Sequence, residues 1–160
     1  CKILTILNKS TIEAIQKYHP EVLIQYAELC KEMRAVDKFD NPPWVCSEQK
    51  IKCCITSGYR HPSKNEEIKG AARNSAHQYG LALDIYVGSF SEQIRWAKQI
   101  EKAKLFTRVG IYPNSPHIHV DLMPLKGEYA TPFLVIDNNG KTIASANNAA
   151  ELESKATKFT

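Results

Sequence analysis

The chain has 160 residues, of which 43% are hydrophobic, and this is enough for one globular domain with its own core. Lys and Arg number 21 against 17 for Asp and Glu, but the basic residues are scattered and form no stripe, which argues against a nucleic-acid-binding protein. No apolar run approaches the roughly 20 residues of a membrane-spanning helix, so no transmembrane segment is expected.

The cysteines indicate an oxidising compartment. Five are many for a cytosolic chain of this size, and none has the CxxC spacing of a redox or zinc motif. Disulfides are expected, with Cys30 and Cys46 as partners of Cys53 or Cys54, although some cysteines could instead be small buried hydrophobes. The sequence begins at Cys1 without a methionine, which suggests removal of an upstream segment and makes Cys1 a candidate site for a lipid anchor.

The first 45 residues are expected to be helical. Ser10 and Glu13 form a capping box for a short helix that ends near His19. Pro20 suits the first turn of a second helix, in which apolar residues recur at the spacing of a buried stripe. These residues are Val22, Leu23, Tyr26, Leu29, Cys30 and Met33.

Residues 51–123 are expected to form the core, and residues 130–160 a C-terminal hairpin and tail. In the hairpin, Asn139 and Gly140 supply the positive φ angles of a tight turn. No linker divides the chain, so 1–160 is predicted to be a single domain. A loop is expected at 40–44, before the core. Within the core we expect strands at 51–57, 81–87, 108–112 and 117–123 and helices at 61–70 and 91–104. A turn at 113–116 is expected to join the last two strands.

The stretch SAHQYGLALDIYV (75–87) raises the first chemical question, because an ionised carboxylate is costly to bury without a partner. Strand alternation places Asp84 on the face opposite Leu83 and Ile85. A cation, a set of backbone donors or a metal ion could balance its charge. His77 lies just before this strand, in a loop that could return its ring over the same face.

The segment HIHVD repeats this arrangement, with His117, His119 and Asp121 on one strand face. If the two strands are antiparallel neighbours, His77, Asp84 and one of these histidines can converge. Two imidazoles and a carboxylate with one open position are the ligands of a catalytic zinc ion. The alternative is that the histidines are ordinary strand residues and Asp84 pairs with an arginine, Arg60 or Arg108.

Three motifs together resemble the zinc D-Ala-D-Ala carboxypeptidases and related peptidoglycan peptidases of the M15 group. They are SxHxxGxAxD (75–84), SGYRHP (57–62) and HIHVD (117–121), and the resemblance covers about residues 51–123. It implies an α+β fold in which a small antiparallel sheet carries the metal site and packs against the N-terminal helices. The Hedgehog signalling domain has the same fold and a similar HIH segment, and it binds zinc without an established peptidase role.

The resemblance assigns roles residue by residue. His77, Asp84 and His119 match the three zinc ligands, and Arg60 matches the arginine that contacts the substrate carboxylate or the developing oxyanion, although it could be a structural ion pair. Ser75 matches a serine near the polar end of the substrate, or it could cap a turn.

The general base departs from the family pattern. Several relatives carry Glu or Asp three residues before the last ligand, where this chain has Pro116. His117 is our candidate for proton transfer, and Asp121 is expected to hydrogen-bond a ligand imidazole and fix its tautomer.

The expected function is zinc-dependent hydrolysis of amide bonds in peptidoglycan peptides, by a monomer outside the cytoplasm, in the periplasm or cell envelope, or by a phage-borne lytic protein. Carboxypeptidase and endopeptidase activities both occur around this signature. The alternatives are a zinc-stabilised binding module and a structural component of the cell envelope or a virion.

Overall fold

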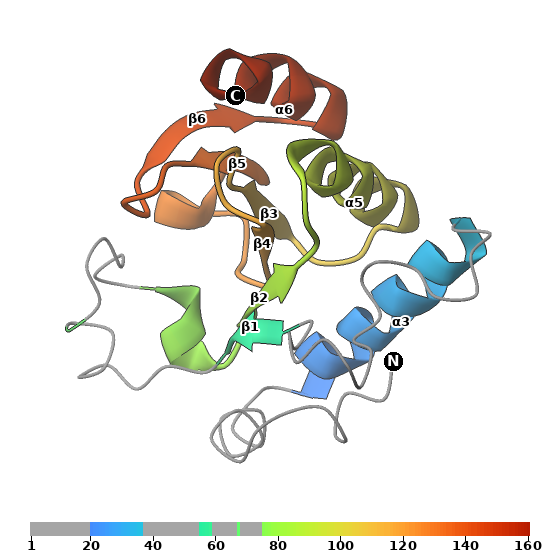
Figure 1. Cartoon of the computed structure of the whole chain (residues 1–160). Coiled ribbons are helices and arrows are strands. Elements are labelled where there is room, and N and C mark those ends of the chain that lie inside the picture. The colour runs from blue at the N-terminus through green and yellow to red at the C-terminus, as the bar shows by residue number, and fades with distance from the viewer. Residues whose placement is uncertain (1–19, 37–54, 59–66, 68–74) are drawn as a thin grey trace.

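The computed structural model describes residues 20–36, 55–58, 67 and 75–160, and the six strands in these residues form one sheet (Figure 1). The strand order is β1-β2-β4-β3-β5-β6. The strands are β1 (Ile55–Ser57), β2 (Ala82–Tyr86), β3 (Arg108–Ile111), β4 (His117–Asp121), β5 (Phe133–Ile136) and β6 (Thr142–Ala146). The helices are α3 (Pro20–Val36), α5 (Phe90–Ala103) and α6 (Ala149–Ala156), with short 3-10 helices η1 (Ala76–Tyr79), η2 (Gly127–Tyr129) and η3 (Thr157–Phe159).

The sheet is mixed, which corrects the expectation of an antiparallel sheet, while the predicted α+β class is confirmed. Every neighbouring pair is antiparallel except β3 and β5, which run parallel with Val109 opposite Phe133. The cause lies in the connection after β4. β4 ends beside the start of β3, with Asp121 opposite Arg108, and residues 122–132 carry the chain to the other edge of β3 at this same end, so β5 runs in the same direction as β3.

The helix α3 follows the predicted stripe. Val22, Tyr26, Leu29, Cys30 and Met33 are buried, and Leu23 is partly buried against the same core. The helix packs beside α5, where the side-chain amide of Gln99 donates to Glu32 at 3.3 Å. The sequence pattern therefore located this helix and its buried side correctly.

One face of the central strands is apolar and lies against the helices. In α5, Ser89 accepts a hydrogen bond from the Glu92 N–H at the N-terminus, and Trp96 is fully buried. The sheet contributes the alternate residues Leu83, Ile85, Val109, Ile111, Ile118 and Val120 to the same core. Because side chains alternate along a strand, the polar residues of β2 and β4 share the other face.

The C-terminal region contains the predicted hairpin and an additional helix. Gly140 has φ 78°, but Asn139 does not have a positive φ, so only one residue of the dipeptide adopts the predicted conformation. The carboxylate of Asp137 closes the turn by accepting from the N–H groups of Asn139 and Lys141. The helix α6 begins at the Asn148 cap and buries Leu152 against the sheet.

Several predictions concern parts of the chain outside the described residues. These are the helix at 10–19, the loop at 40–44, most of the helix at 61–70, four of the cysteines and Arg60. The remaining cysteine, Cys30, is a buried thiol, so the disulfide expected from it is not supported.

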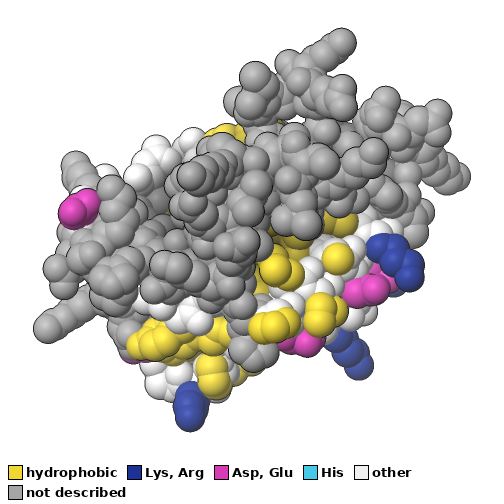
Figure 2. Space-filling view, turned by 90° about the horizontal axis from the view of Figure 1, so that it is seen from below, with side chains coloured by type: hydrophobic (Ala, Val, Ile, Leu, Met, Phe, Trp, Pro, Cys, Tyr) yellow, Lys and Arg dark blue, Asp and Glu magenta, His cyan; other side chains and the backbone are white. Residues whose placement is uncertain are grey.

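The described surface gives two further observations. No helix in the described ranges is long and apolar enough to cross a membrane. On the face seen in Figure 2, the coloured Lys and Arg side chains stand apart from one another, next to acidic and apolar side chains.

Candidate metal centre

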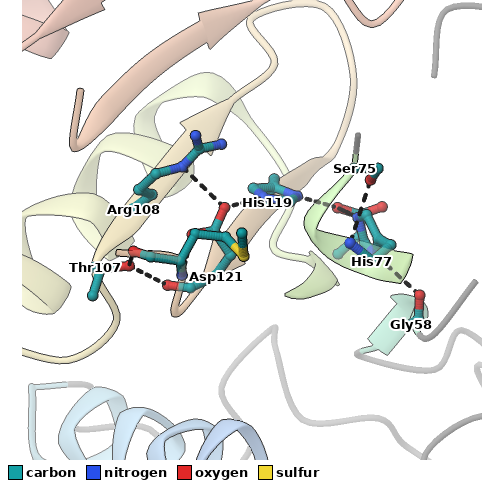
Figure 3. A network of polar contacts seen from close by, with 9 residues as sticks. Gly58, Ser75, His77, Thr107, Arg108, His119 and Asp121 are labelled. Atoms are coloured by element: carbon teal, nitrogen blue, oxygen red, sulfur yellow. Dashed lines mark hydrogen bonds and ion pairs between the residues drawn. The ribbon is translucent and has the colours of Figure 1, made fainter. Parts of the chain in front are cut away.

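Three buried side chains from separate elements converge on the polar face of the sheet. His77 comes from η1, Asp84 from β2 and His119 from β4, and their potential ligand atoms all lie within 4.8 Å of one another. The two strands are antiparallel neighbours with Asp84 directly opposite His119. Oδ1 of Asp84 lies 3.4 Å from Nε2 of His77 and 3.2 Å from Nδ1 of His119 (Figure 3).

The turn that carries His77 is fixed by its own sequence. The Ser75 hydroxyl accepts a hydrogen bond from the His77 N–H at 3.3 Å, and Gly80 ends η1 in the left-handed conformation, at φ 69°. The Nδ1–H of His77 donates to the carbonyl of Gly58, at 2.9 Å, because a carbonyl can only accept. This leaves the Nε2 lone pair directed toward Asp84.

His119 is oriented in the same way by a carboxylate. Its Nε2–H donates to Oδ2 of Asp121 at 2.8 Å, so Nδ1 faces Asp84. Asp121 is fully buried and also accepts from Nε of Arg108 at 3.0 Å and from the N–H of Met123 at 3.1 Å. Arg108 thus pairs with Asp121 and not with Asp84, contrary to the alternative considered for it.

The three groups fit a divalent metal ion. Each imidazole donates one N–H to a protein acceptor and presents its other nitrogen to the cluster, as metal-binding histidines usually do. Nitrogen and carboxylate ligands in this number suit zinc with an open coordination position. The group could therefore hold a metal ion, with ligand atoms Nε2 of His77, an oxygen of Asp84 and Nδ1 of His119.

The electrostatics of the cluster favour a cation. Burial would raise the pKa of Asp84, but the neighbouring His77 and His119 hold it well below its ordinary value, so the carboxylate stays ionised. Burial would lower the pKa of His119, but hydrogen bonds to Asp121 and Asp84 raise it to about 9. In the metal-free chain a proton on His119 therefore occupies the place that a metal ion would take.

His117 lies on the same strand face but has different contacts. Its Nδ1 shares a hydrogen bond with the Ser115 hydroxyl at 2.9 Å, and its ring packs on Tyr112 with the centroids 4.1 Å apart. Burial is the main cause of its lowered pKa; the charge of Asp84 opposes this shift, and the charges of His119 and His77 add to it. His117 is therefore half-buried beside the cluster and is not one of the three convergent groups.

The turn that positions His117 is held by a buried glutamine that the sequence reasoning missed. Gln93 of α5 is 0% exposed, and its amide donates to the carbonyls of Tyr112, at 2.9 Å, and Ser115, while its oxygen accepts from the Tyr112 N–H at 2.8 Å. The carbonyl of Pro116 accepts from the N–H groups at 87 and 88, at 2.9 and 2.8 Å. These contacts fix residues 112–116 against β2 and α5.

The comparisons with known proteins establish the family. Residues 12–121 match the family model described as Peptidase M15, which is more than half of the chain. The chain therefore belongs to the M15 peptidase family, as the three motifs predicted.

Curated relatives give a more distant match. Over 79 residues the chain is 33% identical to the peptidoglycan L,D-endopeptidase MepK of Escherichia coli K12, and equally to MepK of E. coli O157:H7 and of Shigella flexneri. The alignment covers 45% of this chain and 41% of each relative, so the chain spans less than half the length of these relatives. No solved structure was found to match the chain.

Proposed function

We propose that the chain is a zinc-dependent peptidase that hydrolyses amide bonds in peptidoglycan stem peptides outside the cytoplasm. The observation that carries the proposal is the convergence of His77, Asp84 and His119, each imidazole with its remote nitrogen held by a protein acceptor. Membership of the M15 family and the similarity to peptidoglycan endopeptidases support the same reaction class.

The described residues divide the work of amide hydrolysis. His77, Asp84 and His119 would hold zinc, which supplies a Lewis acid that activates water and polarises the scissile carbonyl. Asp121 keeps the Nε2–H of His119 engaged, so that the ligand nitrogen points into the cluster. The ion pair with Arg108 keeps Asp121 ionised, because the pKa of this buried carboxyl is lowered by His119 and Arg108 against the effect of burial.

His117 is the proposed proton carrier. In the tautomer in which Nδ1–H donates to the Ser115 hydroxyl, Nε2 is the atom that would accept a proton from the attacking water and return it to the leaving amine. The lowered pKa keeps the ring neutral at pH 7, as a general base requires.

Substrate contacts are assigned to Arg60 and Ser75 by the family resemblance. Arg60 lies outside the described residues, two positions after Gly58, whose carbonyl accepts from His77. We propose that Arg60 binds the substrate carboxylate or the developing oxyanion. Ser75 caps η1 through its hydroxyl, which is the alternative role expected for it, and we propose that it also lies near the polar end of the substrate.

A second candidate is a zinc-stabilised binding module of the cell envelope or a virion. Pro116 favours the binding module, because several relatives carry an acidic residue, a possible general base, at this position. Here Pro116 contributes a backbone carbonyl, which accepts from the N–H groups of residues 87 and 88 just after β2.

Incubation of the purified chain with muropeptides, with and without a chelator, separates the two candidates. Hydrolysis that disappears with chelator and returns with added zinc supports the peptidase. Mass spectrometry of the products identifies the cleaved bond and so distinguishes carboxypeptidase from endopeptidase action. Zinc binding and chelator-sensitive stability without any cleavage would support the binding module, with His77→Ala as the metal-free control.

A further inference from the structure

Arg108 has a second set of donors that the metal centre does not use. Its Nε donates to Asp121 at 3.0 Å, and this is its one hydrogen bond among the described residues. An arginine carries five N–H donors in a planar fork, so the four N–H groups on the two Nη atoms remain available. Figure 3 shows these terminal nitrogens directed away from the Asp121 carboxylate.

The fork is held rigidly and reaches solvent. The Arg108 side chain is only 11% exposed, yet its Nη atoms are not among the buried polar atoms that lack a partner. The ring of Tyr129 lies against the guanidinium, with the centroid 5.0 Å from Cζ. The ion pair on one edge and the aromatic ring on a face reduce the rotamer freedom that a ligand would otherwise have to remove.

The charge around Arg108 favours an anionic ligand. Asp84 and Asp121 together contribute two negative charges, while Arg108 contributes one positive charge and a bound divalent ion would contribute two. Asp121 also divides its hydrogen bonds among His119, Arg108 and the Met123 N–H. These four charges sum to a positive value once a divalent ion is bound, and a guanidinium fork matches a carboxylate in shape as well as charge.

We propose that Arg108 is a substrate-binding residue whose Nη groups bind a free carboxylate of the peptide, while its Nε holds Asp121. The inference rests on the proposed peptidase function and specifies its substrate as an acidic peptide. The contact would be made from β3, which pairs with β4 on the side away from β2.

The test combines one enzyme variant with modified substrates. Arg108→Lys keeps a positive charge near Asp121 but removes the planar fork. The substrate is the smallest muropeptide that the wild-type chain hydrolyses, together with versions in which each free carboxylate is converted, one at a time, to a carboxamide. The matched control is Arg95→Lys, which makes the same change at a surface ion pair with Glu92 on α5. Zinc content and the melting temperature are measured for every protein.

The expected result is a KM about tenfold to a hundredfold higher for Arg108→Lys on the unmodified peptide, with zinc content unchanged. For one carboxamide version the wild type should show the same rise, and Arg108→Lys should add nothing further to it. Arg95→Lys should behave as the wild type on every peptide.

Two results would overturn the inference. In the first, KM rises equally for Arg108→Lys on all the peptides, which would make Arg108 only a positioning residue for Asp121. In the second, KM is unchanged and only zinc affinity falls. A wild-type chain that hydrolyses no muropeptide would instead overturn the proposed function itself, and this inference with it, so the two failures are distinguishable.

Discussion

The two histidines of β4 stand on the same strand face and are held in opposite ways. His119 has a carboxylate on each ring nitrogen, and its pKa is raised to about 9 despite burial. His117 has a hydroxyl on one nitrogen and an aromatic ring on its face, and burial lowers its pKa. Two histidines only two positions apart therefore have pKa values shifted in opposite directions by their different surroundings.

Removing one of the two histidines that flank Asp84 should have the largest effect. We expect His77→Ala to lose its zinc and its hydrolytic activity, and to be less stable, because Asp84 would keep a buried charge after losing one of its two imidazole neighbours. Metal analysis of the purified variant measures the first effect and thermal unfolding the second. Full zinc occupancy in a His77→Ala and His119→Ala double variant would show that the cluster is not the metal site.

At the first residue of β4, His117→Ala should keep zinc and lose about two to four orders of magnitude in rate, the usual contribution of a positioned acid or base. In the wild type, the rate should fall on acidification only below the ordinary histidine pKa of 6.5, because the pKa of His117 is lowered. Rate profiles against pH, with zinc content measured at each point, test both statements. Loss of the metal in His117→Ala would make His117 a ligand, and an unchanged rate would place the base elsewhere.

The support of His119 can be weakened without removing a ligand. Asp121→Asn should lower zinc affinity by about tenfold to a hundredfold, since Asn still accepts one hydrogen bond but cannot hold His119 and Arg108 by charge. Competition with a chromogenic chelator measures the affinity. Asp137→Asn, in the β5–β6 turn, is the matched control and should bind zinc as the wild type does. Equal affinities in the two variants would contradict the role of Asp121.

The support of His117 should contribute less. Ser115→Ala removes the hydroxyl that contacts Nδ1, and we expect the rate to fall about two- to tenfold, the equivalent of one hydrogen bond. Ser115→Thr should restore most of this loss because it keeps a hydroxyl. Steady-state kinetics should place the effect in kcat rather than KM. A threonine variant as slow as the alanine variant would show that the hydroxyl is not what positions the ring.

The smallest effect concerns the metal-free chain. The pKa of His119 is raised on folding from 6.5 to about 9, so protonated His119 stabilises the folded metal-free chain fully below pH 6.5, and this stabilisation is lost as the pH rises through 9. The melting temperature of the chelator-treated chain should therefore fall by a few degrees between pH 6.5 and 9.5. The zinc-loaded chain should lack this component of the pH dependence. Parallel curves for the two forms would contradict the assignment.

The sequence predicted those features that depend on local periodicity. The stripe of α3, the amphipathic α5 and the alternation in β2 and β4 are set by residues a few positions apart, and the antiparallel pairing of β2 with β4 then brings Asp84 opposite His119. The resemblance to the M15 family supplied the choice of His119 over His117, which alternation alone could not make.

Features that depend on distant pairing were not predictable. Arg108 could have paired with Asp84 or with Asp121, and the register of β3 against β4 places it opposite Asp121. Gln93 was missed because a glutamine in an amphipathic helix is typical of the exposed side, whereas here the distant turn at 112–116 supplies it with buried backbone partners. The parallel pairing of β5 with β3 depends on the path of the eleven-residue connection 122–132, which no local pattern specifies.

The parallel pairing of β5 with β3 has a consequence for solubility. The family match ends at residue 121, so β5, β6 and α6 follow it in the sequence, and β5 covers the side of β3 that faces away from the metal centre. Without these elements β3 would be an edge strand, with unpaired backbone N–H and C=O groups open to another copy of the chain. The last 30 residues thus cover the edge of β3, and a chain ending at residue 121 is expected to expose this edge and to aggregate.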